Sequence, residues 1–417
     1  MKKQSQSHVQ SIIFKNAFFL YGLTFSNYFI GLLLFPYLSR VLSVERFGVI
    51  GFATSVCLVF QMIVEYGFQI STTAKVSLHR DDKIQVSHII STMTYAKAML
   101  AGISSIAFII CAIVMESVRI HALIVSLFFV DTIIKAFLPD AYFRGIERMK
   151  DITIRAVVIK SGILIATLIL VRGDATLVIY PISMIVCDSL ALVWAFVLLR
   201  NDGVGMVQSS FKEILQAIKD SFWFFISRVS VSINGSLGSI FLGMSYSPES
   251  LQMGLYSGAT RLSTAGEQMI PPIGDALYPS MMKKKDYSVF RRIVLVGGCV
   301  WFAVCAAVAA LAPQLCGIIL GDQYISAGNY LRILMFGVFL GFFSFMFGYP
   351  ALSPIGKATY ANAAIMVSAC VNLTVCAILW LTDSITPLSI CIVFASTNLT
   401  VLTVRLGAFM HFRHLAH

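Results

Sequence analysis

Charged residues are scarce in this chain: Asp, Glu, Lys and Arg make up only 12% of its 417 residues. A typical soluble domain has about a quarter of its residues charged and about half apolar. Here 58% of the residues are hydrophobic, so too little polar surface remains to face water on every side. The composition excludes an ordinary soluble protein and predicts an integral membrane protein.

The sequence also lacks the marks of a catalytic or metal-binding domain. None of the nine cysteines has C-x-x-C spacing, and all lie in or beside apolar runs, where free thiols behave as small hydrophobes. The longest loop, residues 200–219, is too short for a catalytic domain outside the bilayer. No metal-ligand cluster or nucleophile–base pair is recognisable. We therefore expect no enzyme, no cofactor, no metal and no disulfide.

Long apolar runs dominate the sequence, and each is long enough to cross a bilayer, which takes about 20 residues. Backbone groups in lipid must pair within their own segment, so such runs predict helices, whereas barrel strands would alternate strictly over about ten residues. We expect the basic N-terminus to lead into a retained first span rather than a cleaved signal peptide. The twelve predicted spans are 16–38, 47–73, 86–114, 120–139, 153–171, 176–199, 219–244, 253–280, 293–312, 327–352, 358–381 and 386–410.

Basic residues are distributed unevenly between the two sides of this topology. Alternate loops and both tails carry most of the Lys and Arg, whereas the opposite side carries only Arg40, Arg46, Arg119 and Arg172. Positive loops stay in the cytoplasm, so both termini are predicted to be cytoplasmic. The formal charge of +11 is thus a sign of topology, and because it is spread over separate segments it does not predict nucleic-acid binding.

Six predicted spans precede the loop 200–219 and six follow it. "FGVIGFATSV" (47–56) aligns with "MGLYSGATRL" (253–262), and both follow a Ser-x-Glu loop. Since each half has an even number of spans, both enter the membrane in the same direction, as in transporters with parallel repeats. The sequence predicts an all-α polytopic membrane protein of twelve transmembrane helices in two six-helix lobes, 1–204 and 205–417. We expect a pseudo-twofold axis along the membrane normal.

Several polar residues fall within the predicted spans, where a charge costs about 2.5–3.5 kcal/mol or more. Lys135 lies one turn after Asp131, and this spacing predicts an ion pair on one helix face. Arg332 lies near a helix end, where its side chain can reach the membrane surface. For Lys97, Lys160 and Asp188, structural and functional roles remain equally open.

The first two spans of each half carry polar stripes at helical spacing, and these predict a hydrated central cavity. A purely structural hydrogen-bond network is the alternative. Arginine presents a planar, permanently charged fork that suits phosphate oxygens, so Arg228 and Arg261 point to an anionic headgroup. The candidate substrate-binding residues are Arg228, Arg261, Gln268, Gln61, Ser232 and Thr264. The candidate ion-coupling residues are Glu65, Glu267 and Asp275, and the Pro271-Pro272 pair is a predicted bend and candidate hinge.

Three segments resemble one family: "PYLSRVLSVERFGVIGFATSV" (36–56), "VEYGFQISTTAKVSLHRDDK" (64–83) and "YFRGIERMKDITI" (142–154). They are similar to the Wzx-type O-antigen flippases of the multidrug/oligosaccharidyl-lipid/polysaccharide exporter superfamily. The resemblance is strong in the first half. In the second half it rests on the span count, "MGLYSGATRL" and "LSPIGKATY" (352–360).

The resemblance implies a V-shaped fold of two lobes around a basic cavity. It implies that undecaprenyl-pyrophosphate-linked O-antigen repeats move from the cytoplasmic to the periplasmic leaflet of the bacterial inner membrane, in lipopolysaccharide biosynthesis. The implied partners are the lipid-linked oligosaccharide, membrane lipids, protons or sodium ions, and other membrane proteins of polysaccharide assembly. Alternating access is the implied mechanism.

Three alternatives stay open at this point. A multidrug exporter of the same superfamily would be expected to have an acidic pocket for organic cations. A membrane-embedded polysaccharide polymerase or glycosyltransferase would be expected to place catalytic groups in a long periplasmic loop. A structural scaffold is the third alternative.

Overall fold

The computed structural model describes residues 30, 31 and 33–416, and all of the secondary structure in this range is helical. This described part contains ten helices, or runs of joined helices, that are long and apolar enough to cross a membrane. The all-α polytopic fold is therefore confirmed. The predicted first span, 16–38, lies mostly outside the described residues. The count of twelve is consistent with the ten spans found in the described part.

The chain divides into two compact units. Unit 1 is built around Cys57–Arg228, and unit 2 around Phe35–Val56 and the chain from Val229 onward. The helices α2 (Val44–Glu65) and α10 (Phe211–Tyr246) each contribute to both units. The lobes 1–204 and 205–417 and their symmetry axis stay predictions.

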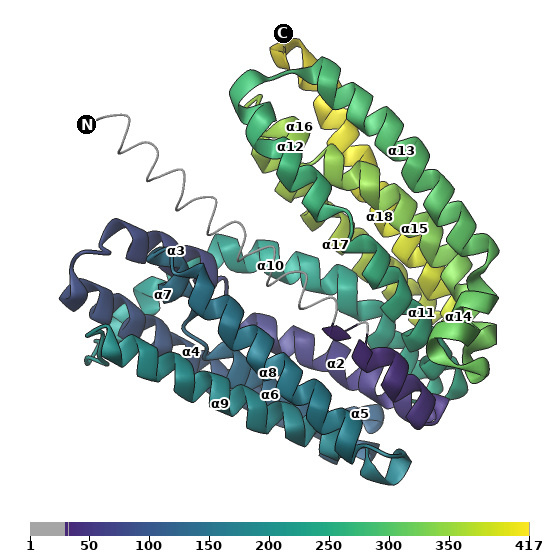
Figure 1. Cartoon of the computed structure of the whole chain (residues 1–417), viewed down its shortest axis with the longest axis horizontal. Coiled ribbons are helices and arrows are strands. Elements are labelled where there is room, and N and C mark those ends of the chain that lie inside the picture. The colour runs from purple at the N-terminus through teal and green to yellow at the C-terminus, as the bar shows by residue number, and fades with distance from the viewer. Residues whose placement is uncertain (1–29, 32, 417) are drawn as a thin grey trace. The chain divides into compact units, whose positions relative to one another are not determined.

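Unit 1 is a bundle in which α9 packs against both α6 and α8, and α3 packs against α7 and α4. Figure 1 shows α8 and α9 running alongside each other. Besides its parts of α2 and α10, the unit contains α3 (Phe68–Leu78), α4 (Lys83–Val114), α5 (Glu116–Ile120), α6 (Ala122–Ala136), α7 (Asp140–Gly145), α8 (Met149–Leu170), η1 (Asp174–Thr176) and α9 (Ile179–Asn201).

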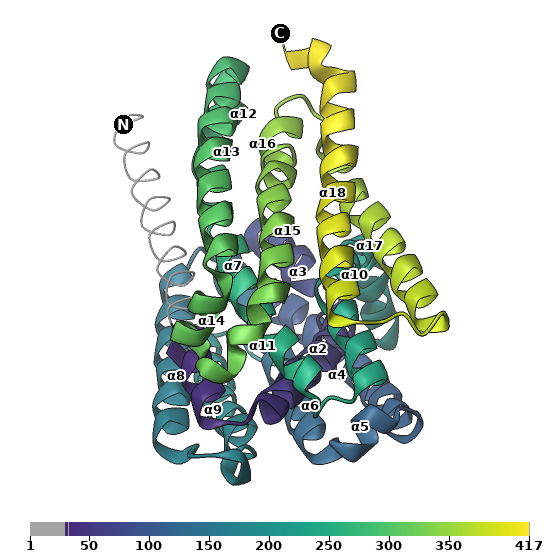
Figure 2. The same cartoon turned by 90° about the vertical axis from the view of Figure 1, so that its right-hand side faces the viewer.

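In unit 2, α15 is the central helix: it packs against α18, α13 and α11, while α17 lies on α18. Figure 2 shows α13, α15 and α18 standing side by side. The helices of the unit are α11 (Leu251–Glu267), α12 (Pro271–Lys284), α13 (Tyr287–Ala310), α14 (Ala312–Leu320), η2 (Asp322–Ala327), α15 (Gly328–Met346), α16 (Tyr349–Leu352), α17 (Ala358–Leu381), α18 (Pro387–Phe412) and η3 (Arg413–Ala416).

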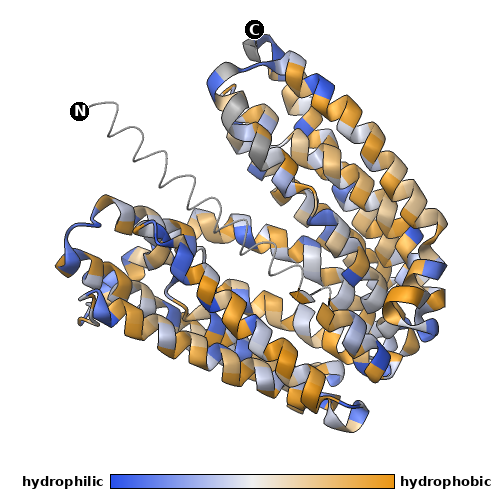
Figure 3. Cartoon of the chain, in the orientation of Figure 1, coloured by the Kyte–Doolittle hydropathy of each residue, from blue (hydrophilic) through white to orange (hydrophobic). Residues whose placement is uncertain are grey.

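Apolar side chains cover the outer faces of the helices, as lipid contact requires. On α4, for example, Ile103, Ile106, Ile110 and Ile113 form an exposed stripe at intervals of three to four residues, each more than half exposed. Figure 3 shows hydrophobic residues along most of the length of the long helices, and hydrophilic ones at the turn between α3 and α4. A polar cap starts α4: the Asp82 carboxylate accepts the backbone N–H groups of Ile84 and Gln85.

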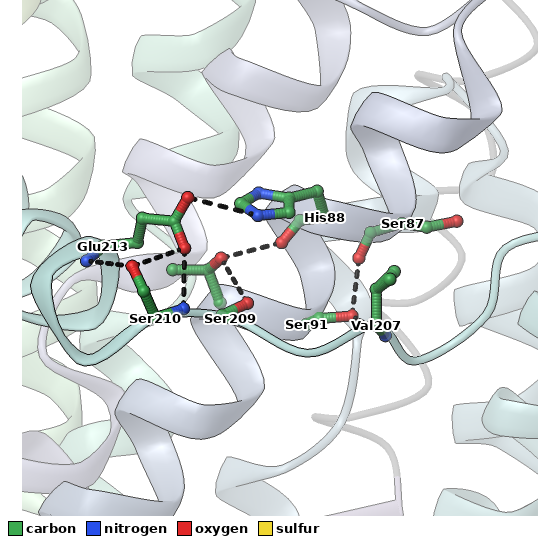
Figure 4. Close-up of polar contacts among 8 residues, drawn as sticks. Ser87, His88, Ser91, Val207, Ser209, Ser210 and Glu213 are labelled. Atoms are coloured by element: carbon green, nitrogen blue, oxygen red, sulfur yellow. Dashed lines mark hydrogen bonds and ion pairs between the residues drawn. The ribbon is translucent and has the colours of Figure 1, made fainter.

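The segment that leads from α9 into α10 lies along α4 and is held by α4 side chains (Figure 4). The Val207 N–H donates to the Ser91 Oγ at 2.8 Å, and the Thr92 and Ser209 hydroxyls are 2.9 Å apart. The His88 Nε2 lies 3.4 Å from a Glu213 carboxylate oxygen. These contacts give the start of α10 a defined position on unit 1.

The second span of each half is a broken helix. In the first half, α2 ends at Glu65, and Tyr66 and Gly67, both with positive φ (44° and 75°), separate it from α3. In the second half, α11 ends at Glu267 and α12 begins at Pro271. The span predicted at 253–280, a helix bent at the proline pair, is therefore two separate helices. The proline pair occupies the first positions of a new helix, where the missing N–H groups are not needed, instead of bending a continuous one.

Candidate functional site

Two residues of the predicted polar stripe on α2 line a cavity inside unit 1. Gln61 donates from Nε2 to Glu65 Oε1 at 2.8 Å, one turn further along the same helix. The cavity has a volume of about 180 Å³ and is lined by Gln61, Glu65, Gln69, Lys97, Lys135, Ala136, Leu138, Asp140 and Ala141. A concave, polar site within a membrane bundle is where a polar ligand group or water can be held.

Arg228 lies on α10 and contacts the edge of this site. Its guanidinium Nη2 is 3.5 Å from Oε1 of Gln69, a long contact between residues 159 positions apart in the chain. Two contacts fix this part of α10 on α3: the Ser71 and Ser221 hydroxyls, 2.8 Å apart, and the Lys75–Asp220 ion pair at 2.7 Å. The predicted cationic residue of unit 1 thus lies beside a residue that lines the polar cavity.

Of the predicted residues of unit 2, Arg261, Thr264 and Glu267 lie on α11. The Arg261 guanidinium lies 4.2 Å from the centre of the Phe35 ring, a cation–π contact. The Glu267 carboxylate has the Asn398 side chain of α18 as a hydrogen-bond partner. Thr264 is exposed, whereas Ser232 on α10 is buried. Gln268 follows the last residue of α11, and its backbone N–H donates to the Thr264 carbonyl.

Three of the predicted residues belong to α12. Pro271 and Pro272 begin this helix, and their role as a hinge stays a prediction. Asp275 lies within the helix, but its side chain is outside the described part of the structure. The structure describes each unit by itself, so the shared central cavity also stays a prediction.

A buried ionic cluster joins α6 and α9. The Lys135 ammonium lies 2.6 Å from Oδ2 of Asp131 and 3.3 Å from Oδ2 of Asp188. The predicted Lys135–Asp131 pair is confirmed, and Asp188 is a second partner that sequence spacing does not reveal. Because a buried charge is costly without a partner, this cluster favours the packing of α6 and α9 that brings the three side chains together.

Lys97 on α4 is a site residue whose role the sequence left undecided. Its side chain is buried, and its ammonium donates to the Ala136 carbonyl at the end of α6 at 2.6 Å. Asp140, the first residue of α7, forms an ion pair with Arg155 of α8. The lysine within an apolar run was the only sequence signal for this part of the site.

The segment 142–154 forms an ionic network at one end of unit 1. Arg148 binds Asp151 at 2.6 Å and Asp202 at 2.5 Å, and the Tyr142 hydroxyl donates to Asp202 at 2.9 Å. Partial burial alone would lower the pKa of Arg148, but its hydrogen bonds to Asp202 and Asp151 raise it above the ordinary value. This motif therefore fastens the start of α8 to the end of α9.

All nine cysteines are free thiols. Within the described ranges, no group of three or more His, Cys, Asp or Glu side chains could hold a metal ion. Among the charged side chains of unit 1, Lys135 and Arg148 pair with aspartates, and Glu65 and Lys97 line the polar cavity.

Comparison with known proteins adds the family. The model of a family described as "Polysaccharide biosynthesis protein" matches residues 13–285. The chain belongs to this family. Two curated members are similar to it: "Putative O-antigen transporter" of Escherichia coli (strain K12), 27% identical over 283 residues and 68% of each chain, and the protein of the same name from Shigella dysenteriae, 25% identical over 327 residues, 76% of this chain and 80% of that one.

The solved structures support the fold of this family member. The lipid II flippase MurJ in an inward closed conformation matches with a TM-score of 0.72 and 12% identity, covering 96% of this chain and 90% of that one. A multidrug resistance MATE family transporter of the MOP superfamily matches with a TM-score of 0.65 and 16% identity, covering 94% of each chain. The resemblance to Wzx-type flippases of this superfamily is confirmed, and the relatives named here are transporters or flippases.

Proposed function

We propose that this protein is a flippase for lipid-linked oligosaccharides, and that its cargo is an undecaprenyl-pyrophosphate-linked O-antigen repeat unit. The cargo would move from the cytoplasmic to the periplasmic leaflet of the inner membrane, with both protein termini in the cytoplasm. Membership of the polysaccharide biosynthesis family and similarity to curated O-antigen transporters support this class of cargo.

The observation that carries the proposal is the guanidinium of Arg228 beside the polar cavity of unit 1. A pyrophosphate must lose water when it crosses the bilayer, and a permanently charged, planar donor compensates part of that loss. Arg261 supplies a second guanidinium from unit 2. In alternating access, the pyrophosphate headgroup would bind to these guanidinium groups during its passage, while the polyprenyl chain stays in lipid.

The experiment combines a deletion strain with variants of these arginines. Loss of the protein should cause lipid-linked repeat units to accumulate inside the cell and surface polysaccharide to disappear. Arg228→Ala with Arg261→Ala should fail to restore the polysaccharide although the protein still inserts, and the paired Lys substitutions should restore part of it. Arg332→Ala is the matched control, because this exposed span arginine donates near helix ends, to the Ala309 carbonyl and to the Asn329 side chain. Normal polysaccharide in the double Ala variant would refute the cationic mechanism.

Coupling to an ion gradient is a separate part of the proposal. Glu65, Glu267 and Asp275 are its candidate residues. In proteoliposomes, replacing the coupling carboxylate by its amide should remove the dependence of flux on a proton or sodium gradient. Unchanged dependence in all three variants would place coupling elsewhere.

A multidrug exporter is the second candidate, because the MATE fold is also similar. The same deletion strain separates the two functions. An exporter of organic cations would leave lipid-linked repeats at their normal level and make the strain sensitive to such cations.

A further inference from the structure

The polar cavity of unit 1 has a lining of mixed charge. Its walls come from five helices and the loop between α6 and α7, and they include Glu65 and Asp140 as carboxylates and Lys97 and Lys135 as ammonium groups. Two of these four charges have partners outside the cavity: Lys135 with Asp131 and Asp188, and Asp140 with Arg155. The walls therefore present compensated charges and amides.

This lining does not favour a small ion of either sign. A free phosphate in the cavity would lie against Glu65 and Asp140, and an inorganic cation would lie against Lys97. A neutral group with several hydroxyls fits better, because a hydroxyl both donates to a carboxylate and accepts from an ammonium or amide. Hydrogen bonds to charged partners are also the stronger ones, about 1.5–3 kcal/mol each.

The size of the cavity limits the occupant. At about 30 Å³ for each water molecule, the cavity volume of about 180 Å³ corresponds to about six waters. One sugar ring with its hydroxyls fits a space of this size, and an oligosaccharide does not. The cavity is therefore suited to a single ring of a longer glycan.

We infer that this cavity is a binding subsite for one sugar ring of the glycan headgroup, and that Lys97 and Gln61 determine its specificity. The inference rests on the proposed function, because the glycan of the proposed cargo is joined directly to the pyrophosphate. The contact between Arg228 and Gln69 places the proposed phosphate-binding arginine beside the cavity wall. Sugar and phosphate would thus bind side by side, on Lys97, Gln61, Glu65 and Arg228.

Lys97 is placed for this role by its burial and by its hydrogen bond. Its side chain is only 6% exposed, and one of its three N–H donors binds the Ala136 carbonyl at 2.6 Å. This bond fixes the ammonium at the cavity wall and leaves two donor positions for sugar hydroxyls. Gln61 contributes an amide whose described hydrogen bond is within its own helix, to Glu65.

The test compares two probes on the full chain in lipid nanodiscs. One probe is undecaprenyl pyrophosphate, and the other is the same lipid bearing a single hexose. Wild-type protein should bind the glycosylated lipid more tightly. Lys97→Met should reduce its affinity for the glycosylated lipid by about tenfold and leave that for the bare lipid unchanged. Lys160→Met is the matched control, because this lysine of α8 is not among the lining residues, and it should change neither affinity.

Gln61→Leu serves as a second variant if Lys97→Met does not fold. This substitution removes the hydrogen bond from Gln61 to Glu65, which lies within α2, so the packing between helices should be kept. Equal affinity of the wild type for both lipids, or an equal loss of both affinities in the cavity variants, would overturn the sugar subsite. The proposed function would still stand after that result if the double variant Arg228→Ala with Arg261→Ala had a reduced affinity for undecaprenyl pyrophosphate. Binding of neither lipid by the wild type would overturn both.

Discussion

The replacement of Gly67 by alanine tests the packing at the break between α2 and α3. Gly67 has a φ of +75°, which costs a residue with a Cβ about 1–2 kcal/mol. Its added Cβ would lie 2.6 Å from the Phe224 Cβ and 3.0 Å from the Phe225 backbone nitrogen, and overpacking of this kind costs about 1–3 kcal/mol. We expect Gly67→Ala to destabilise unit 1 by about 2–5 kcal/mol in total.

The change should also disturb the stacked rings of Tyr66 and Phe225, whose centres are 4.2 Å apart. Because this contact holds α10 on the break, the variant should have reduced transport as well as reduced stability. Thermal unfolding in detergent, followed by fluorescence, measures the stability. A complementation assay for surface polysaccharide measures transport.

Substitutions at two other glycines separate the cost of the positive φ from the cost of overpacking. A Cβ at Gly356 meets nothing within 4 Å, but the residue has a φ of +73°, so Gly356→Ala should show only the conformational cost. Gly102, in α4, has neither a close neighbour nor a positive φ, so Gly102→Ala should melt at or slightly above the wild-type temperature. If Gly67→Ala melts no lower than Gly356→Ala, the close approach of α10 contributes nothing and the reasoning is refuted.

Two further substitutions test buried charges. Lys135→Met leaves the Asp131 and Asp188 carboxylates, whose side chains are 3% and 9% exposed, without their cation, and should lower stability by about 3–5 kcal/mol in thermal unfolding. Adding Asp131→Asn should recover part of the loss, and no recovery would argue against charge as its cause. Arg405→Met removes hydrogen bonds to the Ser344 and Ala361 carbonyls, at 2.7 and 3.0 Å, and should cost about 1.5–3 kcal/mol for each bond whose acceptor is left unpaired. Exposed Arg413→Met is its control, and equal melting of the two variants would contradict this role for Arg405.

The helices were predicted well where the hydrophobicity of a segment alone determines its structure. The spans predicted at 358–381 and 386–410 correspond to α17 and α18, because an apolar segment in lipid can satisfy its backbone only as a helix. The pair Lys135–Asp131 was predictable for a similar reason, since residues four apart face each other on any helix. The proline pair also marked the break in the second half, but as a helix start.

The break between α2 and α3 is a feature that residues close together in the sequence predict only weakly. Pro271 marks the start of α12 in the sequence, whereas the only local signal at the first break is Gly67, since a glycine often follows the end of a helix. The predicted alignment of 47–56 with 253–262 pairs Gln61 with Glu267. The end of α2 at Glu65 therefore corresponds to a position four residues after the end of α11, so the breaks in the two halves differ in sequence position by about one helical turn. At Gly67 the break lies against Phe224 of α10, which is more than 150 residues further along the chain, and sequence spacing does not reveal this contact.

The sequence by itself determined that the protein is a polytopic helical membrane protein, where most of its spans lie and which family it resembles. These properties follow from hydrophobicity and from residues close together in the chain. Only the tertiary structure decided which polar groups meet: Gln69 with Arg228, Asp188 with Lys135, and Lys97 with the end of α6. The physical reason is that a buried charge must find a partner, and packing between helices distant in sequence selects that partner.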